Sequence, residues 1–323
     1  MDKFFEIYST EYYEFIYRNK QLPVDNSILI HDHIGGFNSD YSNDLFDFLN
    51  EVNFNNPILT EYIFHNSEVL KKYKHLNLVF SADFKNDVDI GIFLNYNIHP
   101  ELKFKNMLCS FNGSDHVSRQ LLTSTLQQFG LFNKLYSSKN FSCNALDING
   151  HLMNLNLSNN QQRFYDKFFT DDSKFLNEVY SFNYERFDHN NNIRNLETIL
   201  TESFVHIVSE TMATSYYPFV TEKFLYSVVT RGLFLSYAQP GWHLHVEKYY
   251  GFKKYNKIFD YKFDDIKNPV ERLVELITMI SKFSVLTTDD WHDLYLIEQD
   301  TIEYNYDHYF SKQYLAELKK YEN

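Results

Sequence analysis

The first hundred residues alternate short apolar runs with amphipathic segments. The apolar runs predict strands at residues 27–30, 59–64 and 76–80, and the amphipathic segments predict helices at 10–19, 40–52 and 68–74. Strands that alternate with helices are typical of βαβ units and a parallel sheet, and such sheets bind ligands beyond the carboxyl ends of their strands. We therefore expect functional residues directly after strands.

A second alternating unit begins near residue 104. Residues 106–112 predict a strand, and turn residues that include Asn112 and Gly113 lead into a helix with Arg119 in or near its first turn. Gly130 is expected to end this helix. Its predicted buried face consists of Val117, Leu121, Leu122, Leu126 and Phe129.

The most informative stretch is 204–232. Residues 204–208 predict a strand buried on both faces, with Glu210 at its carboxyl end. A loop leads to a helix for which Thr221 is the expected N-cap and Gly232 the C′ residue. The apolar stripe of that helix is formed by Phe224, Leu225, Val228 and Val229.

Lys223 falls in the first turn of that helix, where a cation opposes the helix dipole at a cost of roughly 0.3–1 kcal/mol. A bound anion would remove that cost. Arg119 occupies the equivalent place in the preceding unit, so the two cations together predict a diphosphate pocket.

The rest of the chain completes a two-domain plan. A strand at 233–237, a short helix at 242–250 and a helix at 268–283 with Asn268 as N-cap are predicted after the central stretch. The expected division is an acceptor-side lobe at 1–103, a donor-binding lobe at 104–287 with a polar insertion around 141–195, and a helical segment at 288–323. Both lobes are expected to be Rossmann-like, with a cleft between them.

Composition narrows the partners. The 323 residues carry a net charge of −13 and a pI near 5.4, which disfavours a broad nucleic-acid or anionic-membrane surface, although a local basic pocket stays possible. No apolar run is long enough to span a membrane and no signal peptide is recognisable, so a cytoplasmic protein is expected, bacterial or in the host cytoplasm if viral. Cys109 and Cys143 lack metal-ligand spacing and are expected to be free thiols.

Several familiar motifs are missing. The sequence contains no Walker A loop, no Gly-x-Gly-x-x-Gly fingerprint, no His-Glu-x-x-His and no Gly-x-Ser-x-Gly, which argues against ATPase, simple dehydrogenase, zincin and serine-hydrolase functions. Cations and carboxylates at one sheet edge suit a nucleotide sugar, because Arg and Lys neutralise a diphosphate and Glu accepts hydrogen bonds from hydroxyl groups.

A family resemblance supports this reading. Glu210, followed after a loop by Tyr217-Pro-Phe-Val-Thr-Glu-Lys223, resembles the donor-binding signature of the fucosyltransferases, and the segment from Ser110 to Arg119 is similar to that family's Ser-Asn…Arg segment. The match covers roughly 110–135 and 200–240, and Thr211 stands where the family has Asn.

The resemblance implies a GT-B fold and inverting, metal-independent transfer from a nucleotide-diphosphate sugar to a hydroxyl of a glycan or glycoconjugate. No separate cofactor is implied. By position, Arg119 and Lys223 would hold the diphosphate and Glu210 and Glu222 would contact ribose or sugar, with Asn112, Gly113 and Thr221 completing the donor site.

Inverting transfer also requires a base on the acceptor side. Asp32 is the first choice and His33 the second, because both follow a predicted strand and precede a Gly-Gly pair, and Glu61 and Asp83 are weaker candidates. Two alternatives stay open: transfer to a modified base in DNA, as in some phage-type enzymes, and a non-catalytic nucleotide-binding or assembly protein.

Overall fold

The computed structural model describes residues 5–8, 28–31, 49–60, 73–80, 104–112, 117–131, 135–139, 189–210, 213, 218 and 220–321. Within these residues the chain forms two separate four-stranded sheets, and all strand pairs in both are parallel. The expected α/β class with parallel sheets is confirmed.

The first sheet has the order β1-β2-β3-β4, so its strands follow one another across the sheet without a reversal. The strands are β1 (Phe5–Tyr8), β2 (Ile28–His31), β3 (Ile58–Thr60) and β4 (Leu78–Phe80). The strands predicted at 27–30, 59–64 and 76–80 correspond to β2, β3 and β4. Strand β1 was not predicted, because its four residues contain Glu6 and mix polar with aromatic positions.

The second sheet has the order β6-β5-β7-β8, which means that the chain runs outward from β5 to one side and then returns to build the other side. Its strands are β5 (Asn106–Asn112), β6 (Leu135–Lys139), β7 (Ser203–Ser209) and β8 (Leu233–Tyr237). The direction of winding therefore reverses between β5 and β7. Such a reversal is the topological switch point at which open α/β sheets bind their ligands.

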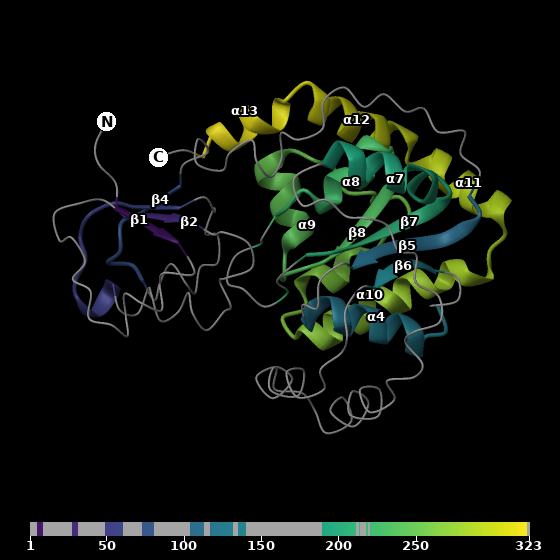
Figure 1. The fold of residues 1–323 in the computed structure, drawn as a ribbon, viewed down its shortest axis with the longest axis horizontal. Coiled ribbons are helices and arrows are strands. Elements are labelled where there is room, and N and C mark those ends of the chain that lie inside the picture. The colour runs from purple at the N-terminus through teal and green to yellow at the C-terminus, as the bar shows by residue number, and fades with distance from the viewer. Residues whose placement is uncertain are drawn as a thin grey trace.

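Helices cover both faces of the second sheet (Figure 1). One face carries α4 (Val117–Gln128) and α10 (Pro269–Ser281), and the other carries α7 (His189–Thr201) and α8 (Lys223–Val229). Because helices lie on both faces, all residues of β7 and β8 are buried, which explains the continuous apolar runs in their sequences.

The remaining elements follow β8. They are α9 (Trp242–His245), a π-helical turn (Val246–Tyr250), two 3₁₀ turns (Tyr261–Asp265 and Lys282–Val285), α11 (Thr288–Ile297), α12 (Gln299–Phe310) and α13 (Gln313–Lys319). Trp291 of α11, Tyr309 of α12 and Leu318 of α13 belong to the same apolar core as the second sheet. The helices α11, α12 and α13 thus share the core of the second sheet.

Two elements of the second sheet's unit were not predicted. Strand β6 carries Ser137, Ser138 and Lys139, so it lacks an apolar run, and α7 begins in an Asn-rich stretch that was assigned to the polar insertion. Further along α7, Ile193, Leu196, Ile199 and Leu200 are buried at helical spacing. That periodicity outweighs the poor helix propensity of its asparagines.

One residue of the predicted buried face of α4 is not buried. Leu121, Leu122 and Leu126 are buried as expected, but the Phe129 side chain is 38% exposed. Phe129 lies beyond the last helical residue, and Gly130, with φ of 68°, turns the chain in the left-handed region directly afterwards. The helix therefore ends before it can direct Phe129 into the core, while the prediction that Gly130 ends it is confirmed.

Both predicted ends of α8 also need correction. The helix begins at Lys223 with Glu222 as N-cap, and the Thr221 hydroxyl donates to Glu210 while only a long 3.4 Å contact reaches the Lys223 N–H. At the other end Arg231, not Gly232, adopts the left-handed conformation, with φ of 54°. The bonds Gly232 N–H to Ser227 C=O and Arg231 N–H to Val228 C=O complete a Schellman motif around it.

Gly232 is required for a different reason. A Cβ atom built there would overlap the imidazole ring of His206 on the neighbouring strand β7. The glycine thus makes room for a buried side chain, which is a packing requirement that one sequence cannot reveal.

No helix in the described part of the chain is long and apolar enough to cross a membrane.

Candidate functional site

The candidate site lies at the carboxyl ends of β5 and β7, where the winding of the second sheet reverses. Strand β5 ends at Asn112, and Glu210 directly follows β7. Both side chains are fully buried. A buried amide and a buried carboxyl at a topological switch point are polar groups in the place where such sheets bind ligands.

Glu210 is held by hydrogen bonds on its main chain and its side chain. Its N–H donates to the Tyr237 carbonyl at 3.1 Å, which extends the pairing with β8 by one residue. Carboxylate Oε1 accepts the Thr221 N–H at 3.2 Å and Oε2 accepts the Thr221 hydroxyl at 2.6 Å. These contacts join the end of β7 to the start of α8.

Lys223 reaches back into the same cluster. Its ammonium group donates to the Thr221 hydroxyl at 3.0 Å and lies 4.0 Å from Glu210 Oε2 and 3.7 Å from Glu222 Oε1. The two carboxylates therefore offset the unfavourable position of this cation in the first turn of α8. No bound anion is needed to explain Lys223, although its side chain keeps 24% exposure and is accessible to one.

Electrostatics at Glu210 are dominated by burial. Burial raises the pKa of the Glu210 carboxyl, the Lys223 ammonium and the Thr221 hydroxyl act in the opposite direction, and the neighbouring Glu222 carboxylate raises it further. The site consequently combines a partly exposed cation with a carboxyl whose ionised form is destabilised by burial.

The start of α4 is attached to the same point. The Ser118 hydroxyl, in the first turn of α4, donates to the main-chain carbonyl of Glu210 at 3.0 Å. Arg119 follows directly, is 5% exposed and lies in a first turn that contains no acidic residue. The bond from Ser118 brings the N-terminal turn of α4, and with it Arg119, to the end of β7.

Asn112 completes the described part of the site. Its amide nitrogen donates to Ser110 Oγ at 2.9 Å, but its carbonyl oxygen Oδ1 has no hydrogen-bond partner in the described part of the chain. A buried acceptor without a partner costs free energy unless a ligand or water supplies the donor.

The structure thus brings Glu210, Thr221, Glu222 and Lys223 together at the end of β7. Asn112 ends the adjacent strand β5, and Arg119 lies in the first turn of α4, next to the residue that bonds Glu210. The other predicted site residues, Asp32, His33 and Gly113, lie outside the described residues, as do Glu61 and Asp83. Ser118 was missed, since a serine after a turn is usually a helix cap and its partner is distant in the sequence.

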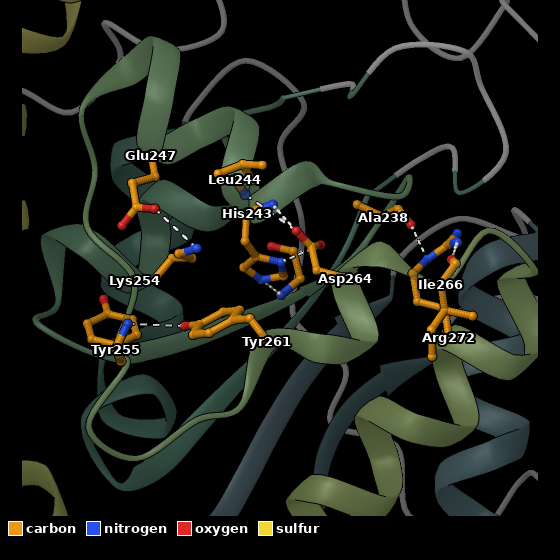
Figure 2. A network of polar contacts seen from close by, with 11 residues as sticks. Ala238, His243, Leu244, Glu247, Lys254, Tyr255, Tyr261, Asp264, Ile266 and Arg272 are labelled. Carbon is orange, nitrogen blue, oxygen red and sulfur yellow. Dashed lines mark hydrogen bonds and ion pairs between the residues drawn. The ribbon is translucent and has the colours of Figure 1, made fainter. Parts of the chain in front are cut away.

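A second buried polar group involves His243 and Asp264, which lie side by side in Figure 2. His243 Nε2 accepts the Ser236 N–H at 2.9 Å, so its other nitrogen, Nδ1, carries the proton donated to Asp264 Oδ1 at 2.8 Å. Asp264 Oδ2 accepts the main-chain N–H groups of His243 and Leu244 at the start of α9.

Among the described strands β8 lies at the edge of its sheet, where main-chain N–H groups have no strand partner. His243 satisfies one of them. Both of its ring nitrogens are thereby occupied, which indicates a structural role for this histidine.

Among the described residues no group of three or more His, Cys, Asp or Glu side chains is arranged to hold a metal ion. Cys109 is buried, and burial raises the pKa of its thiol to about 12, which keeps it a neutral core side chain.

Comparisons with known proteins give no family. No protein-family model matches the chain, and no curated protein matches it in sequence. Among solved structures it is similar to a UDP-forming α,α-trehalose-phosphate synthase from Burkholderia xenovorans, at 12% identity and a TM-score of 0.36 over 97% of this chain and 77% of that one.

A second such synthase, from Burkholderia vietnamiensis, has 10% identity and a TM-score of 0.38 over 97% and 75% of the two chains. A glycosyltransferase from Rickettsia africae has 11% identity and a TM-score of 0.40 over 96% and 80%. These identities and TM-scores are too low to carry a functional conclusion. None of these three structures is described as a fucosyltransferase. Function has to be inferred from the sheet edge itself.

Proposed function

We propose that this protein is an inverting, metal-independent glycosyltransferase that moves a sugar from a nucleotide-diphosphate sugar to a hydroxyl acceptor. The observation that carries the proposal is the convergence of α4 and α8 on Glu210 at the switch point of the second sheet. Ser118 ties the first turn of α4 to this residue, and Lys223 of α8 contacts its carboxylate. Each element brings one cation, Arg119 and Lys223, as a diphosphate requires.

The cations have the clearest role in this proposal. The N-terminal turn of the twelve-residue α4 offers main-chain N–H groups beside Arg119, and Lys223 is partly exposed. Together they would neutralise the diphosphate and stabilise it as a leaving group, which supplies electrostatically what a metal ion supplies in other transferases.

In this proposal Glu210 and Glu222 have different roles. Both Glu210 oxygens already accept hydrogen bonds from Thr221, so this residue is suited to hold Thr221 and Lys223 in place. Glu222 retains 14% side-chain exposure and is the better candidate to accept bonds from ribose or sugar hydroxyls. The Asn112 carbonyl oxygen adds a buried acceptor for a donor group of the nucleotide.

Asp32 remains our proposed catalytic base, with His33 as the second candidate; both directly follow β2, whose last residue is His31. A carboxylate there would take the proton of the acceptor hydroxyl while the diphosphate leaves. Asp32→Asn should abolish transfer and leave donor binding unchanged, and full turnover by this variant would rule the assignment out. The proposal includes two lobes, divided near residue 103, that face each other across the substrates.

The decisive experiment is a panel of nucleotide sugars screened for thermal stabilisation and then for release of the nucleoside diphosphate. A donor present at 100 times its Kd should add about 2.7 kcal/mol to the free energy of unfolding. Inversion predicts that NMR of the first product shows the opposite anomeric configuration to the donor. A protein stabilised by donors without any turnover would instead be a binding protein.

Metal independence is tested by a separate experiment. The sequence contains one Asp-x-Asp pair, Asp87 and Asp89, outside the described residues. Turnover should be equal in excess EDTA and in millimolar Mg²⁺ or Mn²⁺. A loss of turnover in EDTA that Mn²⁺ restores would contradict this part of the proposal.

A further inference from the structure

Arg272 is a buried cation whose hydrogen-bond acceptors are main-chain carbonyl groups. It lies in the first turn of α10 and its side chain is 1% exposed. Nε donates to the Ala238 carbonyl at 3.0 Å and one terminal nitrogen donates to the Ala213 carbonyl at 2.6 Å. The other terminal nitrogen donates to the carbonyls of Ile266 and Lys267 at 2.5 and 3.1 Å.

The positions of these carbonyls are informative. Ala238 directly follows β8, and Ala213 lies three residues after Glu210 in the connection from β7 to α8. Figure 2 shows the Arg272 side chain directed toward Ala238 and Ile266. Arg272 thus fastens the segments that leave the carboxyl ends of β7 and β8 to α10.

Only arginine fits this arrangement, because its planar guanidinium group spreads five N–H donors over three nitrogen atoms. A lysine ammonium has all its donors on one nitrogen atom. It cannot reach all the carbonyls that the three separate nitrogens of Arg272 bind. Burial lowers the pKa of Arg272, and the charge is tolerated because the carbonyl dipoles solvate it.

The connection that Arg272 holds also carries part of the candidate site. The connection begins after Glu210 and ends at Thr221, and the Glu210 carboxylate accepts two hydrogen bonds from Thr221. Between these two residues, Arg272 donates to the carbonyl of Ala213. Ala213 lies between Glu210 and Thr221 in the chain, and Lys223 donates to the Thr221 hydroxyl, so we expect a shift of Ala213 to reach these residues.

We propose that Arg272 is a positioning residue for the nucleotide-diphosphate site, acting through Ala213 and Ala238 rather than by contact with the ligand. This inference rests on the proposed function for the ligand, but its structural half, the placement of the Glu210–Thr221 connection, is separable from it.

The test compares Arg272→Met and Arg272→Gln with a matched control, Arg231→Met. Arg231 is also buried at 5% exposure; its Nε lies 3.0 Å from both Glu303 carboxylate oxygens and its guanidinium group stacks on Tyr306. It precedes the amino end of β8, at the edge of the sheet opposite the site. Both buried cations should contribute to stability, but only Arg272 should contribute to binding.

Two readouts are measured at a temperature where all variants are folded. The first is the Kd for UDP and GDP by titration calorimetry, for which we expect at least a tenfold increase in both Arg272 variants and less than a twofold change in Arg231→Met. The second is amide hydrogen exchange without ligand. Exchange should accelerate in peptides covering 209–221 in the Arg272 variants, and in peptides around 228–234 and 300–306 in the control.

The outcomes separate the two claims. If the wild type binds neither nucleotide, the proposed function fails, and the exchange data alone decide whether Arg272 positions the connection. If the wild type binds and all three variants lose affinity equally, or the Arg272 variants lose none, the positioning role is overturned. Unchanged exchange over 209–221 in the Arg272 variants overturns it as well.

Discussion

The contact between Gly232 and His206 shows how strongly single residues constrain this fold. His206 is 2% exposed on β7, its Nε2 donates to the Leu200 carbonyl at 2.7 Å in the neutral form, and its ring occupies the space that a side chain at position 232 would need. Gly232 directly precedes β8, and its position beside His206 leaves no room for a Cβ atom.

Gly232→Ala should therefore destabilise the protein severely, by about 3 kcal/mol or more, because the imidazole ring cannot move out of a packed core. The control is Gly130→Ala, where a Cβ meets nothing within 4 Å and only the left-handed backbone, with φ of 68°, is strained, at roughly 1 kcal/mol. Urea unfolding measures both variants. Adding His206→Ala to Gly232→Ala should recover part of the loss, and strictly additive effects would contradict the proposed overlap.

His206 should also make the protein sensitive to acid. Burial lowers the pKa of His206 to about 4. Between pH 6.5 and pH 4 the imidazole is therefore protonated in the unfolded chain and neutral in the folded protein. Stability should fall by about 1.4 kcal/mol per pH unit, roughly 3 kcal/mol in all, as pH drops from 6.5 to 4. In His206→Gln, which keeps a donor for Leu200, this contribution should disappear. Parallel pH profiles of urea midpoints for the two proteins would show that His206 is not responsible.

At the scale of elements, the central joint is the one between β7 and α8. Glu210 and Thr221 are eleven residues apart, and their two hydrogen bonds fix where α8 begins. This is why the helix starts at Lys223 instead of using Thr221 as a simple cap, a competition between side-chain partners that local sequence cannot resolve.

The same joint predicts a pH dependence of opposite sign. Because burial raises the pKa of Glu210, the folded protein binds this proton more tightly than the unfolded chain does, and the resulting contribution to stability is lost as pH rises through the folded pKa. Glu210→Gln can accept the Thr221 N–H and donate to the Thr221 hydroxyl, so it keeps the geometry without the charge. Its stability relative to the wild type should increase from pH 4.5 to 8 in urea unfolding. A constant difference across that range would contradict the predicted cost of the charge.

Elements with strong periodic patterns could be predicted from the sequence, and elements defined by tertiary packing could not. Strand β8 and helix α10 have the predicted bounds within a few residues, and Asn268 caps α10 through bonds from the N–H groups of Val270 and Glu271. Strand β6 and helix α7 were missed because serine and asparagine in them hide the apolar positions.

At the scale of the whole molecule, sequence order alone did not show that the two sheets are wound differently. The strands β1 to β4 follow in simple order, whereas β5 to β8 reverse direction. That reversal selects the carboxyl ends of β5 and β7 over those of β6 and β8. Glu210 and Lys223 lie at or next to the end of β7. Strand order is set by long-range pairing, which no local pattern encodes.

The candidate site was partly predictable for a related reason. Arg119, Glu210 and Lys223 could be chosen because charges are uncommon directly after buried strands or inside a first helical turn. Ser118 and Arg272 could not, because their importance comes from partners 92 and 59 residues away.

The most direct test of the central claim is titration calorimetry of wild type, Lys223→Ala and a control lysine variant with UDP, GDP and the corresponding nucleosides. The control is Lys262→Ala, since Lys262 is 85% exposed and pairs only with the neighbouring Asp260 among the described residues. We expect one diphosphate site in the wild type and in the control, at least tenfold weaker binding in Lys223→Ala, and no effect of that variant on any nucleoside binding. Absence of diphosphate binding by the wild type, or equal affinity of the two lysine variants, would contradict a diphosphate site at the carboxyl edge of β5 and β7.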